Sequence, residues 1–178
     1  MSIWKSLLCL VGVLIVAPSA HAEPTSTNVR IAGLFSPDRE KDLRELFEQW
    51  PEVKLVRIVF ARSEAELSFD SEKIFPKAKP ADVIARLNDR VRSLSNSTFG
   101  VKPLSEVPWD KLTLVEIPIA GLDCKACCLA AYEIVAKIDG VEAATASFRE
   151  GRLTATIDPT KTTKAKLEAV LKERGVLK

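Results

Sequence analysis

Two stretches of this chain share one pattern of apolar and polar positions. The segments NVRIAGL, from Asn28, and EIPIAGL, from Glu116, alternate apolar with other residues, which is typical of a half-buried β-strand. Each is followed by apolar residues at i, i+3 and i+4, the spacing of one buried helix face. These residues are Leu43, Leu46 and Phe47 in the first stretch, and Ala131, Ile134, Val135 and Ile138 in the second. The pattern predicts a strand and then a helix, twice.

The similarity continues beyond the first helix of each stretch. One constant shift aligns Gly33-Leu34 with Gly121-Leu122, Val53 with Val141, Phe60 with Phe148 and Asp70 with Asp158. Two strands joined by a turn follow in each copy, VKLVRIVF and AELSFD in the first, VEAATASF and RLTATID in the second. A second helix is expected at about 80–94 and at 163–174. The order β-α-β-β-α-β, found twice, predicts an α+β protein with two tandem ferredoxin-like sandwiches.

We expect the first copy to span residues 28–102 and the second 112–178, with the proline-containing segment 103–111 as a linker. Two features of the second copy depart from the repeated pattern. Only Val176-Leu177-Lys178 follow Gly175, so its last strand is expected to be short or to be supplied by another segment, such as the linker. Pro118 falls within an expected central strand, where the missing N–H removes a ladder hydrogen bond.

The first 22 residues differ in character from the rest of the chain. Lys5 provides a short positive region, residues 7–17 are apolar, and Ala20-His21-Ala22 has the small-x-small form of a cleavage site. The apolar segment is too short for a comfortable membrane span. We therefore expect residues 1–22 to be a signal peptide cleaved after Ala22, with the remaining chain periplasmic or secreted and without a membrane span.

Removal of that segment changes the set of available ligands. Of four cysteines, one histidine and one methionine, only Cys124, Cys127 and Cys128 would remain. Disulfides form in oxidising compartments, but three thiols do not all pair within one chain. Hydrophobic residues make up 47% of the chain and the net charge is only +2, which fits a globular protein and gives no support for a nucleic-acid partner. No Ser-His-Asp pattern or phosphate-binding loop is evident in the sequence, so we expect no enzyme activity.

The three remaining cysteines lie together in GLDCKACC, between the first strand and first helix of the second copy. Cys124 is expected on the loop and Cys127 in the first helical turn. The positive end of a helix and its unpaired N–H groups favour thiolate over thiol. Two thiolates that converge from a loop and a helix suit Cu(I), Zn(II), Cd(II) or Hg(II), whereas Mg(II) and Ca(II) prefer oxygen.

Residues 112–176 resemble a heavy-metal-associated (HMA) domain, as in periplasmic mercury-binding proteins, copper chaperones and the N-terminal modules of soft-metal P-type ATPases. The resemblance rests on the loop G-[ML]-x-C-x-x-C, on Gly140-Val141 after the first helix and on Gly175 after the second. Residues 28–102 resemble the family more weakly. The resemblance implies that Cys124 and Cys127 bind the metal. It also implies that Gly121 supports the loop and that Leu122, in place of the usual methionine, packs beneath it.

Three neighbouring side chains have two interpretations each. In family members that handle zinc, cadmium or lead, the position of Asp123 resembles an aspartate ligand, which suits a divalent ion better than Cu(I). Alternatively, its carboxylate stabilises the helix end. Cys128 stands where the family commonly has a small residue such as alanine. It is either a third thiolate, suited to Pb(II), Cd(II) or Hg(II), or a small buried hydrophobe. Lys125 either offsets the negative charge of the site or is simply solvated.

The first copy has the same loop without its sulfur ligands. It reads GLFSPDRE, so Ser36 replaces the first cysteine and Arg39 the second. Ser36-Pro37 predicts a helix N-cap followed by proline at the first helical position, and Asp38 suits the helix dipole. We expect that this copy does not bind soft metal through the loop and serves as a structural or partner-docking module.

Three functions of different classes fit these residues. The first is a soft-metal carrier or scavenger that exchanges its ion with a partner, which the resemblance implies to be a metal-transporting membrane protein. The second is thiol–disulfide exchange by Cys124 and Cys127, although the loop lacks the aromatic and proline neighbours of thioredoxin-like motifs. The third is an interaction module with a structural disulfide. We favour the first, because the loop suits soft-metal ligation and no catalytic group is needed.

Overall fold

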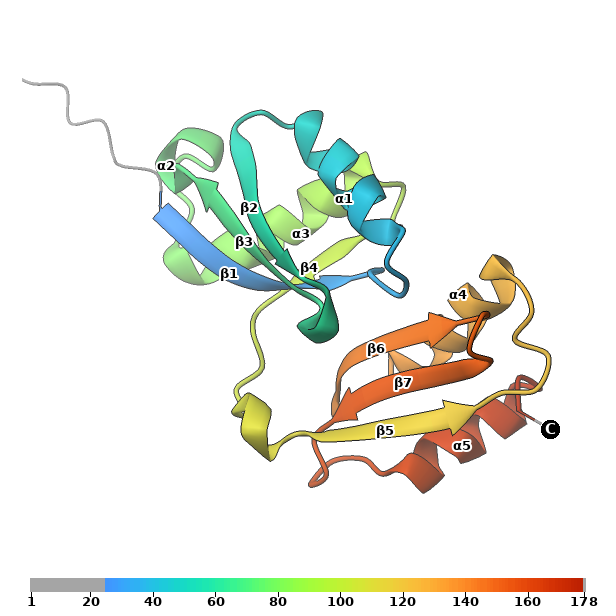
Figure 1. The fold of residues 1–178 in the computed structure, drawn as a ribbon. Coiled ribbons are helices and arrows are strands. Elements are labelled where there is room, and N and C mark those ends of the chain that lie inside the picture. The colour runs from blue at the N-terminus through green and yellow to red at the C-terminus, as the bar shows by residue number, and fades with distance from the viewer. Residues whose placement is uncertain (1–24, 178) are drawn as a thin grey trace, which may run out of the picture.

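The computed structural model describes residues 25–177, so the expected signal peptide lies outside the described residues. Residues 25–102, here the N-terminal unit, form an antiparallel sheet with strand order β2-β3-β1-β4 (Figure 1). Its strands are β1 (Thr25–Ala32), β2 (Val53–Val59), β3 (Glu64–Phe69) and β4 (Gly100–Lys102). Helices α1 (Arg39–Glu48) and α3 (Val83–Leu94) bury Leu43, Phe47, Leu87 and Val91 in the same core as the strands.

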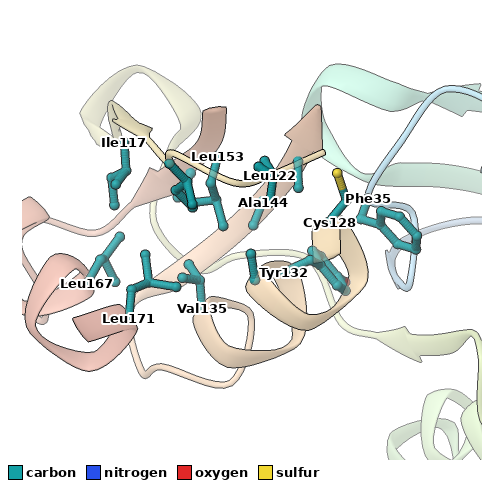
Figure 2. Packing of buried hydrophobic residues seen from close by; sticks show 14 of the residues in the cluster. Phe35, Ile117, Leu122, Cys128, Tyr132, Val135, Ala144, Leu153, Leu167 and Leu171 are labelled. Carbon is teal, nitrogen blue, oxygen red and sulfur yellow. The ribbon is translucent and has the colours of Figure 1, made fainter. Parts of the chain in front are cut away.

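Residues 113–177, here the C-terminal unit, form a second antiparallel sheet with the order β5-β7-β6. Its elements are β5 (Thr113–Pro118), α4 (Lys125–Val135), β6 (Val141–Ser147), β7 (Arg152–Ile157) and α5 (Lys164–Glu173). They enclose a separate core that includes Ile117, Val135, Leu153, Leu167 and Leu171 (Figure 2). The period-2 and helical patterns of the sequence predicted all of these elements, because each buries one face.

The segments between these elements are short helices and turns. The longer connection of the N-terminal unit contains α2 (Ser71–Ile74) and a 3-10 turn at Pro80–Asp82, and a further 3-10 turn follows β2 at Phe60–Arg62. Within the expected linker 103–111, the described structure is a 3-10 turn at Trp109–Lys111, and the Arg62 guanidinium lies over the Trp109 ring, 5.1 Å from its centroid. Among residues 25–177, no helix combines the length and the apolar character that a membrane crossing requires.

The last strand of the second copy is not formed in the described residues. Gly175 has a φ of +72° and donates its N–H to the Lys172 carbonyl, while Val176 and Leu177 donate theirs to the Leu171 carbonyl. This is the hydrogen-bonding pattern of a Schellman motif, which ends a helix by folding the chain back onto it. Val176 and Leu177 then pack against the core of the unit instead of pairing with β5. The element order β-α-β-β-α-β is present in the described N-terminal unit. In the described C-terminal unit the last strand, which we expected to be short or to be supplied by another segment such as the linker, takes neither form.

The position of Pro118 follows from this difference. With three strands described, β5 is an edge strand and not a central one. Ile119 donates its N–H to the Gly151 carbonyl at 2.8 Å. Backbone nitrogens of an antiparallel strand point alternately toward and away from the neighbouring strand, so the nitrogen of the preceding residue, Pro118, points away from β7. The missing N–H of Pro118 thus removes no hydrogen bond within the sheet, and a proline on an open edge disfavours pairing with another strand.

Candidate metal site

A loop of six residues connects β5 to α4 and carries the cysteine motif. Two residues constrain the conformation of this loop. Gly121 has a φ of +89°, and Leu122 is 3% exposed and belongs to the core of the C-terminal unit. Only glycine adopts such a φ routinely. Leu122 therefore packs as a core side chain of this unit. The buried leucine and the left-handed glycine together hold the start of α4 beside the end of β5.

Cys124 begins helix α4 by capping it with sulfur. Its backbone is extended, and its Sγ accepts a hydrogen bond from the Cys127 N–H at 3.1 Å. The predicted placement of Cys124 on the loop and of Cys127 in the first turn is confirmed. Because the N–H groups of the first turn have no partner within the helix, they and the helix dipole stabilise negative charge on this sulfur.

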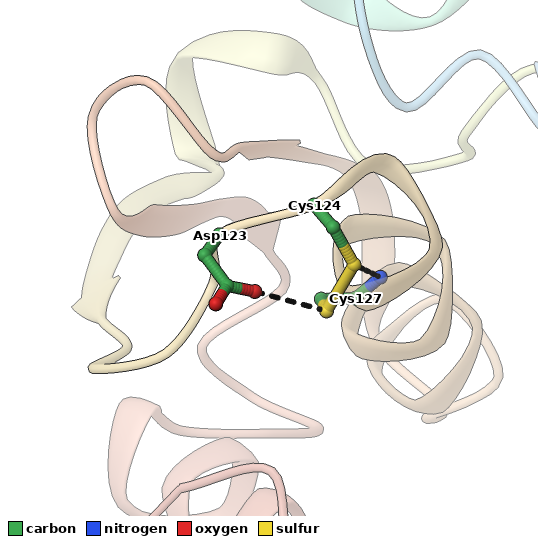
Figure 3. Close-up of a disulfide and its surroundings, with 3 residues drawn as sticks. All are labelled: Asp123, Cys124 and Cys127. Atoms are coloured by element: carbon green, nitrogen blue, oxygen red, sulfur yellow. Dashed lines mark hydrogen bonds between the residues drawn. A yellow bond between two sulfur atoms is a disulfide. The ribbon is translucent and has the colours of Figure 1, made fainter.

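Three candidate ligand atoms meet at this helix start. Cys124 and Cys127 are joined as a disulfide, with 5.2 Å between their Cα atoms. An Asp123 carboxylate oxygen lies 3.4 Å from the Cys127 sulfur (Figure 3). One ligand atom from each of the three residues lies within 4.8 Å of the others. The Asp123 side chain does not cap α4, because the cap comes from Cys124, and its carboxylate lies beside the two sulfurs.

Cys128 is not part of this group of candidate ligand atoms. Its side chain is 1% exposed and belongs to the core of the C-terminal unit, outside the group formed by Asp123, Cys124 and Cys127. Burial raises the pKa of the Cys128 thiol above its ordinary value of 9.0, and the charge of Asp38 adds to that effect, while a backbone hydrogen bond at Phe148 opposes it. In this conformation Cys128 is a small buried hydrophobe and a protonated thiol.

Lys125 pairs with the N-terminal unit. Its Nζ lies 2.6 Å from an Asp38 carboxylate oxygen, and this hydrogen bond is the main reason why the pKa of Asp38 lies below its ordinary value of 3.8. A bond donated by the Ser36 hydroxyl lowers this pKa further. Both side chains of the Lys125–Asp38 pair are more than half exposed, so the pair contributes little stability. Lys125 is therefore largely exposed to solvent, and its ammonium group pairs with Asp38 of the other unit.

The loop of the N-terminal unit does not start its helix as predicted. The Ser36 hydroxyl donates to the Asp38 carboxylate instead of capping, and α1 begins only at Arg39. The Arg39 guanidinium lies over the Phe99 ring, 4.5 Å from its centroid, and also bonds Asp42. No sulfur takes part at this loop, as the sequence requires.

Sequence reasoning missed the contact of Phe35 with Tyr132 and the pairing of Asp38 with Lys125, by which the N-terminal unit approaches the start of α4. One signal was present. Phe35 occupies the loop position that corresponds to Asp123, and a large apolar side chain in a polar loop indicates burial against something else. The identity of that surface depends on how the two units pack, which periodicity does not encode.

Comparison with protein-family models and with curated proteins found no match. Among solved structures, oxidized MerP from Ralstonia metallidurans CH34 aligns over 36% of this chain and 89% of its own, with 25% identity and a TM-score of 0.35. The CopZ metallochaperone aligns over 35% of this chain and 94% of its own, with 21% identity and a TM-score of 0.34. The N-terminal soluble domains of Bacillus subtilis CopA align over 86% of this chain and 90% of their own, with 16% identity and a TM-score of 0.34.

Proposed function

We propose that this protein binds one soft heavy-metal ion between the thiolates of Cys124 and Cys127, with the Asp123 carboxylate as a third ligand. The observation that carries the proposal is the convergence of these three ligand atoms within 4.8 Å at the start of α4. We further propose that the chain consists of two tandem HMA-like domains after a signal peptide, of which the first has lost its ligands. Gly121, Leu122 and the cap at Cys124 serve to hold the loop for ligation.

Metal binding requires the reduced form of the loop. A dithiol reductant supplies two electrons and two protons, the Cys124–Cys127 bond breaks, and the reductant becomes its own disulfide. The ion then displaces protons from the two thiols, so binding becomes weaker as the pH falls. The helix start favours the resulting negative charge. Two sulfurs with one carboxylate oxygen suit Zn(II) or Cd(II) better than Cu(I), which is satisfied by two thiolates alone.

The location of the site supports a carrier or scavenger rather than an enzyme. Asp123 is exposed and Cys127 only half-buried, so an incoming ligand can reach the ion and replace the protein thiolates one at a time. We propose a metal-transporting membrane protein as the exchange partner and a periplasmic or secreted location. The partner is proposed from the resemblance to the HMA family, and the location from the signal-peptide character of residues 1–22.

The disulfide itself favours one alternative. Cys124 and Cys127 are already joined, and a cysteine at a helix start has the low pKa that thiol–disulfide exchange uses. In that function the pair would pass electrons to a substrate dithiol or disulfide and no ion would be retained. A purely structural disulfide in an interaction module would be neither reduced readily nor metal-binding.

Native mass spectrometry of the freshly reduced protein distinguishes these functions. The protein is offered Cu(I), Zn(II), Cd(II), Pb(II) and Hg(II) in competition, beside a Cys124→Ser/Cys127→Ser variant and a matched Cys128→Ser variant. We expect one ion per chain in the wild type and in Cys128→Ser, and none in the double variant. No retained ion, with the Cys124–Cys127 disulfide re-forming in air, would overturn the metal-binding proposal in favour of the redox or structural functions.

A further inference from the structure

The N-terminal unit contacts the C-terminal unit through the loop that follows β1. Ala146, on the free edge of β6, donates its N–H to the Phe35 carbonyl at 2.9 Å. Gly33 donates its N–H to the Tyr132 hydroxyl of α4 at 2.6 Å. We call residues 33–38 the docking loop (Figure 1). It is the counterpart of the cysteine loop, so one copy of the repeat docks on the other through the loop that has lost its ligands.

Phe35 fills a place in the core of the other unit. Its side chain is 7% exposed, it belongs to the buried cluster of the C-terminal unit, and its ring centroid lies 5.5 Å from that of Tyr132. Tyr132 follows Cys128 by four residues, so both lie on one face of α4. Figure 2 shows the Cys128 sulfur on the side of the helix where Phe35 lies. The docking loop therefore covers the face of α4 that carries the third thiol.

Two ion pairs across the contact make it specific. Arg30 on β1 pairs with Glu142 on β6, and their side chains are only 18% and 11% exposed. Arg30 also donates to the Glu142 backbone carbonyl at 3.1 Å. The second pair is Lys125 with Asp38. Arg30 precedes Phe35 in the chain and Asp38 follows it, so an ion pair to the other unit is formed both before and after the apolar residue, which fixes the register of the contact.

We propose that the docking loop is an intramolecular cover that keeps the Cys128 thiol out of reach of solvent and of metal, and that separation of the two units uncovers it. The closed form then offers an ion two sulfurs and a carboxylate, and the open form exposes a third sulfur beside them. The importance of the cover for metal handling rests on the proposed function, but the cover itself does not.

The rate at which Cys128 reacts with N-ethylmaleimide tests the cover. The thiol adds across the maleimide double bond, with a new C–S bond and the proton transferred to the ring carbon, so the added mass reports the reaction. In a full-length chain with Cys9, Cys124 and Cys127 all changed to Ser, Cys128 is the sole thiol, whether or not residues 1–22 are removed. No metal is present. Failure of metal binding and failure of the cover are therefore separate results.

We expect slow labelling in this background and a rate about tenfold higher after Phe35→Ala, as local opening becomes easier. Phe75→Ala is the matched control, because Phe75 packs on Trp50 within the N-terminal unit and away from the contact. Its rate should equal that of the background. A second variant, Tyr132→Phe/Arg30→Gln, removes polar contacts without leaving a cavity and decides the outcome if Phe35→Ala unfolds. The proposal would be overturned if the folded background protein were labelled as fast as the urea-unfolded protein. It would also be overturned if neither Phe35→Ala nor Tyr132→Phe/Arg30→Gln, while still folded, were labelled faster than the background.

Discussion

Tyr132 offers the sharpest test of whether the contact between the units contributes to stability. Its hydroxyl, on α4, accepts the N–H of Gly33 at 2.6 Å, and both residues are buried. Replacement by phenylalanine keeps the ring packing with Phe35 but leaves the Gly33 N–H buried without its acceptor. A buried donor that loses its partner costs about 1–3 kcal/mol. We therefore expect Tyr132→Phe to lower the free energy of unfolding by about that amount.

Urea unfolding with two probes measures this effect. In a background with Trp4 and Trp109 changed to Phe, Trp50 is the sole tryptophan; it is 5% exposed in the core of the N-terminal unit and its fluorescence reports on that unit, while far-UV circular dichroism follows both units. Because Tyr132 belongs to the C-terminal unit, a lower midpoint in the Trp50 signal shows that the contact couples the two units. The matched control is Leu114→Ala, since Leu114 lies on β5 and is 64% exposed. If Tyr132→Phe shifts neither midpoint more than this control does, the bond contributes nothing and the reasoning fails.

The same residue gives a dependence on alkaline pH. Burial raises the pKa of Tyr132 above its ordinary value of 10.0, although the Gly33 N–H partly opposes this. The unfolded chain therefore loses the phenol proton at a lower pH than the folded chain. The stability that neutral Tyr132 contributes is complete below about pH 10 and declines as the pH rises through the folded pKa. Tyr132→Phe should flatten this part of the unfolding profile, and an unchanged profile would contradict the assignment.

Three further predictions concern the cysteine loop. Leu122→Ala should lower the free energy of unfolding, measured in urea, by about 2–4 kcal/mol, because the side chain is only 3% exposed. Leu122→Met should lower it by less than about 1.5 kcal/mol. Gly121→Ala should lower the free energy of unfolding by about 1–2 kcal/mol, because the φ of Gly121 is +89° although an added Cβ would have open space. Gly33→Ala, in the docking loop, should lower it by more, because an added Cβ would lie 2.1 Å from the Thr98 carbonyl oxygen. Asp123→Asn should leave the unfolding midpoint unchanged and lower Zn(II) and Cd(II) retention relative to Cu(I) about tenfold in competition mass spectrometry. An unchanged ratio would remove Asp123 from the ligands.

The elements of the fold could be predicted because their signals are local. A strand with one buried face must alternate, and a helix with one buried face must repeat at 3.6, so β1, α4 and β7 follow from their own residues. The last strand of the second copy is absent from the described residues for a reason that is also local. Gly175, at a left-handed φ, ends α5 by folding the chain back onto the helix. The glycine was visible in the sequence, but the choice between a turn into a strand and a Schellman motif depends on what Val176 and Leu177 pack against.

The local geometry of the cysteine loop could be predicted from the sequence, but the contacts that the other unit makes with it could not. Cys124 at the cap, Cys127 in the first turn and Leu122 beneath the loop are consequences of a single strand–loop–helix segment. The surroundings of Cys128 and Lys125 do not follow from that segment, because they include Phe35 and Asp38 of the other unit. A sequence pattern describes which faces of an element are apolar, but not which distant segment covers them.

Cys128 shows how a residue of one unit can have its surroundings shaped by the other unit. The sequence allowed this residue to be either a third thiolate or a buried hydrophobe, and nothing within GLDCKACC separates the two. In the structure Cys128 is buried in a core cluster that also contains Phe35, the residue at the loop position that corresponds to Asp123. An aspartate there would place a charge against the ring of Tyr132 in the core, at a cost of several kcal/mol for an unpaired buried charge. The loop position that carries a candidate ligand in the C-terminal unit therefore carries the apolar docking residue in the N-terminal unit. A carboxylate at position 35 would not be compatible with this contact, so the identity of that one residue separates the two loops.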